Sequence, residues 1–135
     1  MVRQGFPVGL NDWYIMVWYD IRTEEELNDV YNALITMECP DYKAREACMT
    51  LSQWNKGYTY TNYDKHVTLM FIGKAKSAEQ TYDTIAHERK HAVEHISNYY
   101  GVDPKNEEAA YLQGEIARQM FPAAAFLVCP KCQHR

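Results

Sequence analysis

The sequence predicts one α+β domain in which helices pack against a small sheet. Segments dense in β-branched and aromatic residues predict strands, and segments with apolar residues every three or four positions predict helices. Helix-capping residues separate the segments. The 135 residues, 47% of them apolar, suffice for a single hydrophobic core. The predicted order is β-α-α-β-β-α-α over one domain, 1–135, with residues 122–135 as a tail of no assigned structure.

Strands are predicted at 12–21, 58–63 and 66–72. The first is almost continuously apolar or aromatic, which is typical of a strand buried on both faces. The other two are joined by Asn-Tyr-Asp-Lys, a composition typical of a hairpin turn.

Two helices are predicted between the first and second strands. Thr23 and Glu26 have the spacing of a capping box, and the apolar periodicity that follows continues to about Met37. A second, shorter helix is expected from Asp41 to Trp54.

Two more helices follow the predicted hairpin. Ser77 and Gln80 have capping-box spacing, and no helix breaker follows before Tyr100. Asp103 is the expected cap of the last helix, which we expect to end just before Pro122.

Composition excludes several classes of function. The formal net charge is −4 and the chain has no long Lys/Arg block, which argues against nucleic-acid binding. No apolar run approaches the roughly 20 residues of a membrane helix. The first residues do not have the pattern of a secretory signal, so we expect a cytoplasmic protein whose four cysteines are thiols or ligands.

One pentapeptide predicts a metal site with an adjacent general base: His87-Glu88-Arg89-Lys90-His91. Residues four apart on a helix share one face, about 6 Å apart along the axis, so both imidazoles can reach one metal ion. Two neutral histidines suit Zn²⁺, and Glu88 beside them suits a general base. Zinc lowers the pKa of its bound water to about 7, which provides hydroxide at neutral pH.

The alternative interpretation is a solvated helix face with two surface histidines. The pattern is rare by chance, at about 0.015 expected occurrences for this composition. Apolar residues on both sides of it, Ile85, Ala92 and Val93 among them, predict that the helix is anchored on a core. Both features favour metal binding.

A complete zinc site needs a third protein ligand. His95 lies about 12 Å from His87 along a helix, too far to share one ion. The candidates are Glu107, Glu108 and Glu115 on the next predicted helix. A strictly antiparallel pair of helices would favour Glu115, because the second helix returns to the level of the histidines only near residues 112–115.

The pentapeptide followed by a carboxylate-bearing helix resembles the gluzincin type of zincin metallopeptidase. The chain from Ser77 to Phe121 is also similar to small HExxH proteins encoded by phages and mobile elements, in which a Glu precedes a small-Tyr-Leu triplet by three residues. Ala110-Tyr111-Leu112 matches that triplet. The resemblance implies Glu107 as the third ligand, a zincin-like fold and a peptide or protein substrate.

The resemblance also implies a role for the strand before the metal helix. The predicted strand 66–72 takes the place of the zincin edge strand, which would hold an extended peptide by backbone pairing. His66 on it is a further candidate site residue. Tyr111, one turn after Glu107, either faces the metal or belongs to the core.

Cys129-Pro-Lys-Cys132 has the spacing of half a structural zinc site. Cys39, Cys48 and His134 are the possible remaining ligands of a second zinc. Otherwise these cysteines are thiols or a bridge formed by oxidation.

The leading hypothesis is therefore a small zinc-dependent metallopeptidase, with zinc on His87, His91 and Glu107 and with Glu88 as general base. The competing hypothesis is an interaction protein that retains the zincin fold and zinc site without turnover. The short chain favours this alternative, because it leaves little material for the second lobe of a substrate cleft.

Overall fold

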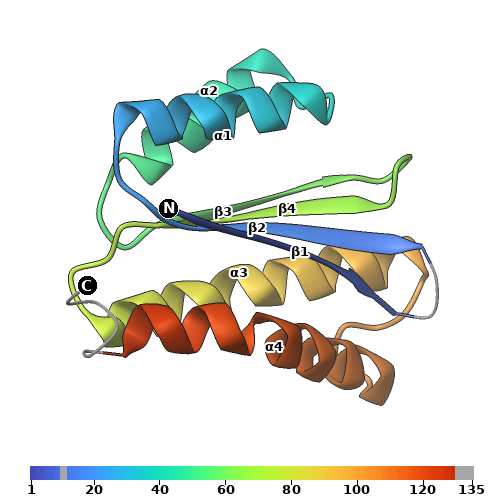
Figure 1. Ribbon diagram of the computed structural model, residues 1–135. Helices are drawn as coiled ribbons and strands as arrows, with labels where there is room; N and C mark the ends of the chain where they lie inside the picture. Colours follow the sequence, from blue (N-terminus) through green and yellow to red (C-terminus); the bar gives the residue numbers. More distant parts are fainter. Residues whose placement is uncertain (10–11, 130–135) are drawn as a thin grey trace.

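The computed structural model describes residues 1–9 and 12–129, in which a four-stranded sheet lies between two layers of helices (Figure 1). None of the helices in this part of the chain combines the length and the apolar character that a membrane span requires. The elements in chain order are β1 (Val2–Val8), β2 (Trp13–Ile21), α1 (Glu24–Thr36), α2 (Asp41–Leu51), β3 (Gly57–Asn62), β4 (Val67–Gly73), α3 (Ala78–Tyr99) and α4 (Glu107–Val128).

The sheet is mixed, with the strand order β1-β2-β4-β3. β2 pairs antiparallel with β1 and parallel with β4, and β3 pairs antiparallel with β4. The α+β class is confirmed. The predicted strand 66–72 corresponds to β4, but its expected position at an edge is wrong, because β4 lies between β2 and β3. The edge beside α3 is β3.

The sequence prediction missed β1. Its residues include Gly5 and Pro7, which are depleted in strands, and they show no apolar run. Pro7 is tolerated here because β1 is an edge strand and needs ladder hydrogen bonds on one side only. The element order therefore begins β-β rather than β-α.

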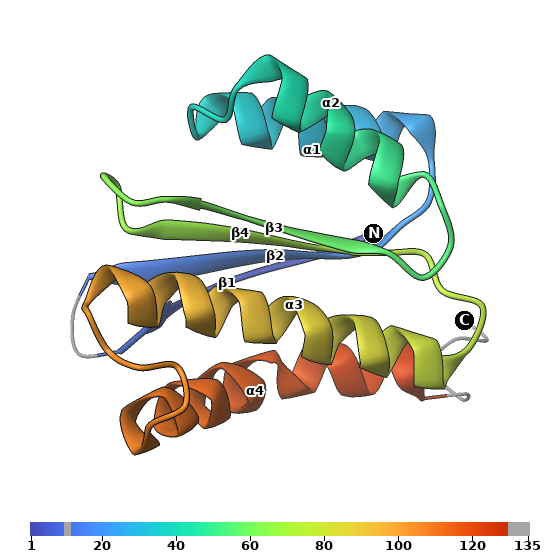
Figure 2. The ribbon, with the colours of Figure 1, turned by 180° about the vertical axis from the view of Figure 1, so that it is seen from behind.

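One face of β2 is fully buried, whereas on the other Trp18 is buried, Met16 and Asp20 are half-buried and Tyr14 is exposed. The predicted burial on both faces is therefore confirmed only in part. The chain leaves β2 toward α1 on one face of the sheet and leaves the parallel strand β4 toward α3 on the other face (Figure 2). One core therefore lies under α1 and α2, around Leu34 and Phe71, and another lies under α3 and α4, around Ile15 and Ile116.

The capping predictions for α1 and α3 agree with the structure. Thr23 and Glu26 form a complete capping box at α1. The Ser77 side chain accepts a hydrogen bond from the Gln80 backbone N–H at the start of α3.

The prediction for the last helix is wrong at both ends. α4 begins at Glu107 with Asn106 as its cap, and it continues through Pro122 to Val128. Pro122 removes one helical hydrogen bond, but Met120 and Ala124 on either side of it are buried in the core. This packing offsets the lost bond, so residues 123–128 are helical rather than an unstructured tail.

Candidate metal centre

The two histidines of the pentapeptide lie on one side of α3 and face each other. Their Nε2 atoms are 3.1 Å apart and their rings meet edge to face. Two ligands of a tetrahedral zinc ion, each about 2.0–2.1 Å from the metal, are themselves separated by about 3.3 Å. His87 is exposed, and the His91 side chain is 42% exposed. The pair therefore fits two adjacent positions around one ion and is open to solvent.

Glu88 points from the same turn of α3 to the edge strand. It is only 4% exposed, and its Oε1 accepts a hydrogen bond of 2.8 Å from the Thr59 hydroxyl. A Cβ added at Gly57 would lie 2.5 Å from Glu88 Cγ, so the carboxylate fits there only because residue 57 is glycine. The sequence analysis named Glu88 but missed both partners in β3.

The environment of Glu88 shifts its acidity. Burial raises the pKa of the carboxyl group, while the Thr59 hydrogen bond and the charges of His91 and His87 lower it; burial has the larger effect. The proton-bound form of Glu88 is therefore stabilised relative to an exposed glutamate.

The structure does not bring the α4 glutamates to the histidines. The side of α3 that packs against α4 carries Ile85, Val93 and Ile96. At 3.6 residues per turn, the two histidines lie nearly opposite these residues around the helix axis. α4 occupies the side with the apolar residues because its own buried side chains complete that core.

Each candidate third ligand has another environment. Glu107 accepts a hydrogen bond from Tyr111 Oη. Tyr111 itself is 71% exposed, so it does not belong to the core, and it borders the cavity next to Trp13. Glu115 accepts from the backbone N–H of Gly9 beside the β1–β2 connection. Glu108 lines a cavity next to Trp13. Within residues 1–9 and 12–129, no three His, Cys, Asp or Glu side chains lie close enough together to hold one ion.

Acidic and basic neighbours of the pair come from α3 itself. Glu94 Oε2 lies 3.8 Å from His91 Nδ1, the ring nitrogen that does not face His87. His95 turns to the sheet, where its Nδ1 lies 2.8 Å from Thr61 Oγ1. Burial lowers the pKa of His95, which favours its neutral form.

The proposed cysteine site is not assembled in the described residues. Cys39 and Cys48 belong to the layer of α1 and α2, whereas Cys129 lies at the end of α4 on the other face of the sheet. Cys132 and His134, the other predicted ligands near Cys129, lie outside the described residues.

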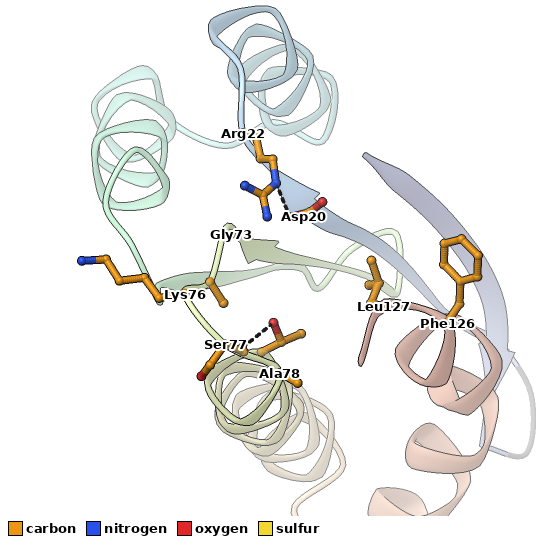
Figure 3. Close-up of a pocket in the computed structure, with 10 residues that line it drawn as sticks. Asp20, Arg22, Gly73, Lys76, Ser77, Ala78, Phe126 and Leu127 are labelled. Atoms are coloured by element: carbon orange, nitrogen blue, oxygen red, sulfur yellow. Dashed lines mark hydrogen bonds and ion pairs between the residues drawn. The ribbon is translucent and has the colours of Figure 1, made fainter. Parts of the chain in front are cut away.

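Two cavities open elsewhere on the surface. One of about 640 Å³ lies beyond the carboxyl ends of β2 and β4 and is bordered by Arg22, Lys76 and the first turn of α3 (Figure 3). The other, about 610 Å³, is lined by Trp13, Tyr100 and α4. Neither includes His87 or His91, both of which are accessible to solvent.

The chain matches no family model, no curated protein and no solved structure. No relative therefore supplies a function for these residues.

Proposed function

We propose that this protein is a zinc-dependent hydrolase, a small metallopeptidase of zincin type, in which His87 and His91 bind the ion and Glu88 is the general base. The observation that carries the proposal is the 3.1 Å separation of the two Nε2 atoms beside a carboxylate buried against the edge strand. An ordinary solvated helix face gives no reason to bury that carboxylate.

The donor set fits zinc in part. Two neutral imidazoles suit Zn²⁺, and their spacing suits two of its four positions. Glu107, which the resemblance implies as the third ligand, would have to reach the ion from the other side of α3. The proposal therefore rests on the two histidines, with Glu107 kept as an expectation of the resemblance.

We assign the role of general base to Glu88, which follows His87 directly on α3. Zinc, when bound, supplies a Lewis acid that polarises a carbonyl and lowers the pKa of water to about 7. Glu88 would accept the proton of the attacking water and return it to the leaving amine. Its raised pKa favours the second half of this cycle, and the Thr59 hydrogen bond fixes the orientation of the carboxylate.

Peptide as the substrate comes from the resemblance. The structure adds a compatible surface, because the outer edge of β3 has no partner strand among the described residues. An extended chain paired along this edge would pass beside the turn that contains Glu88.

Metal analysis and peptide hydrolysis test the proposal on the full chain. We expect zinc to bind the unmodified protein and to be lost in His91→Ala. We expect Glu88→Gln to keep zinc and lose on the order of 10²–10⁴-fold in hydrolysis. His95→Ala is the matched control, a histidine of the same helix that should leave zinc content unchanged. Equal zinc in the unmodified protein and in His91→Ala would contradict the metal site.

A second candidate is a non-catalytic interaction protein that binds zinc at the same histidines. The lack of a third metal ligand in the described part of the chain favours it. It predicts zinc binding that depends on His91 but no hydrolysis of a peptide library, whether residue 88 is Glu or Gln.

A further inference from the structure

A second cluster of titratable side chains lies at the carboxyl end of α3, away from the histidine pair. There the start of β2 and the β3–β4 turn meet the last turn of the helix. His66 Nδ1 lies 2.8 Å from Asp12 Oδ2, and His66 Nε2 lies 3.0 Å from the Tyr99 hydroxyl. The three side chains form a continuous chain of carboxylate, imidazole and phenol.

The imidazole in the middle is held on every side. Its ring stacks on Trp13 with 4.8 Å between centroids and 17° between planes. Trp13 is 2% exposed, and its indole N–H donates to Thr68. The Tyr100 hydroxyl donates to the second Asp12 oxygen, which fixes the carboxylate as well.

The backbone of His66 is also in an uncommon conformation. Its φ of 55° lies in the left-handed region, which costs free energy for a residue other than glycine. Such a conformation persists only where the surrounding contacts compensate for it, and these residues concentrate at functional sites. Here the contacts that hold the residue include those of the imidazole and the hydrogen bond from the Tyr14 backbone N–H to the His66 carbonyl.

Both hydrogen bonds are compatible with the neutral tautomer of His66 that carries its proton on Nδ1. In that tautomer His66 donates from Nδ1 to Asp12 and presents the lone pair of Nε2 to the Tyr99 hydroxyl. This order of nucleophile, base and orienting carboxylate is the one that activates hydroxyl nucleophiles in covalent catalysis. Tyr99 is 47% exposed, so its hydroxyl can meet an external reagent.

We propose that Tyr99 is a nucleophile activated by Asp12 and His66, and that it accepts an acyl group from an uncharged activated ester. Its Oη forms a bond to the acyl carbon, the bond from that carbon to the leaving oxygen breaks, and the phenol proton moves to His66 Nε2 and from there to the leaving group. The exposed ring of Tyr63, stacked on Tyr99 with 5.9 Å between centroids, suits an apolar or aryl substituent. The Asp12 carboxylate disfavours anionic donors such as phosphates.

This site is independent of the proposed metal centre. Eight residues separate Tyr99 from His91, about 12 Å along the helix. No metal is required for the acyl transfer, so the reaction should continue in the presence of a chelator. Loss of zinc binding and loss of Tyr99 reactivity are therefore separate outcomes.

The test uses the full chain, p-nitrophenyl acetate and EDTA, with peptide mapping by mass spectrometry. Tyr82 lies on the same helix and is 51% exposed, so it is an internal reference for an ordinary phenol. We expect Tyr99 to be acetylated on the order of 100-fold faster than Tyr82. This ratio is measured within one folded molecule and needs no variant.

Two variants then test the relay. His66→Gln and Asp12→Asn should each reduce the acetylation rate of Tyr99 to near that of Tyr82. A Tyr99 rate equal to or below the Tyr82 rate in the unmodified protein would overturn the proposal, because it would mean that the cluster only joins the turn to the helix. Rapid acetylation that survives both variants would overturn the assignment of the base.

Discussion

Against α1 and α2 the sheet presents Trp18, Leu69 and Phe71. Against α3, strands β3 and β4 add the threonines Thr59, Thr61 and Thr68 to apolar residues such as Met70 and Ile72. Five buried polar residues lie on the α3 side: Thr61, Thr68, Thr84, Glu88 and Ser97. Buried polar groups cost free energy unless they are hydrogen-bonded. The α1–α2 side has one such residue, Asn62, whose Nδ2 donates to the Met37 carbonyl, so most of the buried polar groups and both candidate sites lie on the α3 side.

The difference extends to the two buried tryptophans. The indole N–H of Trp13 donates to Thr68, which bonds Thr61, which in turn bonds His95. The indole N–H of Trp18, on the other face, has no hydrogen-bond partner among the described residues. The longer chain of buried hydrogen bonds therefore lies on the α3 side, whereas the α1–α2 side has isolated ones such as Asn62 to the Met37 carbonyl. The following predictions test this difference in order of decreasing expected effect.

The largest effect is expected in the apolar core. Leu34 lies in α1 on the face toward the sheet and is fully buried. Leu34→Ala should lower the free energy of unfolding by about 2–5 kcal/mol. Ile35, its neighbour in the same helix, is 40% exposed, and Ile35→Ala should change it by about 0.5 kcal/mol. Urea unfolding of the two variants measures the contrast. Equal losses would mean that α1 does not present this face to the sheet.

The next effect tests the contact between Glu88 and β3. Gly57→Ala places a methyl group within the Glu88 side chain and should cost about 1–3 kcal/mol. Gly114 in α4 has no other atom within 4 Å of an added Cβ, so Gly114→Ala should stabilise by about 0.5–1 kcal/mol. Thermal unfolding should therefore shift in opposite directions for the two glycines. An unchanged unfolding temperature in Gly57→Ala would mean that the Glu88 side chain does not contact β3 at Gly57.

A comparable or smaller loss of unfolding free energy is expected when the hydrogen-bonded polar chain of Trp13, Thr68, Thr61 and His95 is broken. Thr68→Val keeps the shape of a fully buried side chain but leaves the Trp13 indole N–H without an acceptor, which should cost about 1–3 kcal/mol. Trp18→Phe is the comparison on the other face, since it removes no hydrogen bond. Denaturant unfolding together with near-UV circular dichroism would follow both. An unchanged stability in Thr68→Val would remove the polar chain as a distinguishing feature.

The smallest effect is a dependence of stability on pH. Burial lowers the pKa of His95 below its ordinary 6.5, with a further lowering by His91 and an opposing effect of Glu94. Protonation then favours the unfolded chain, so the stabilisation from neutral His95 is complete above pH 6.5 and declines as the pH falls below it. Urea midpoints between pH 7.5 and 5 should fall less in His95→Gln. If the urea midpoints of the unmodified protein and of His95→Gln fall equally with pH, His95 is not the group responsible.

The regular elements with strong periodic patterns were predictable from sequence. Thr23 and Ser77 marked two helix starts, and the dense apolar run after Asp12 marked a largely buried strand. β1 was not predictable, because Gly5 and Pro7 are acceptable only where an edge position relieves them of one set of hydrogen bonds. The continuation of α4 past Pro122 likewise depends on long-range burial of Ala124.

The candidate metal centre likewise has some features that were predictable from sequence and others that were not. The i, i+4 spacing of His87 and His91 predicts their shared helix face, because helical geometry is local. The partners of Glu88, which are Gly57 and Thr59, lie about thirty residues away and depend on the packing of α3 across β3. The position of Glu107 depends on the side of α3 that α4 covers, and no local pattern defines that side.

The amino-acid sequence alone determined the α+β class, the starts of α1 and α3 and the facing histidines, because each arises from interactions within a few residues. Only the tertiary structure decided that β3 forms the edge beside α3, that α4 packs opposite the histidines, and that Asp12, His66 and Tyr99 meet. These features follow from the burial of apolar surface between elements distant in sequence, which selects one arrangement among many that the same local patterns allow.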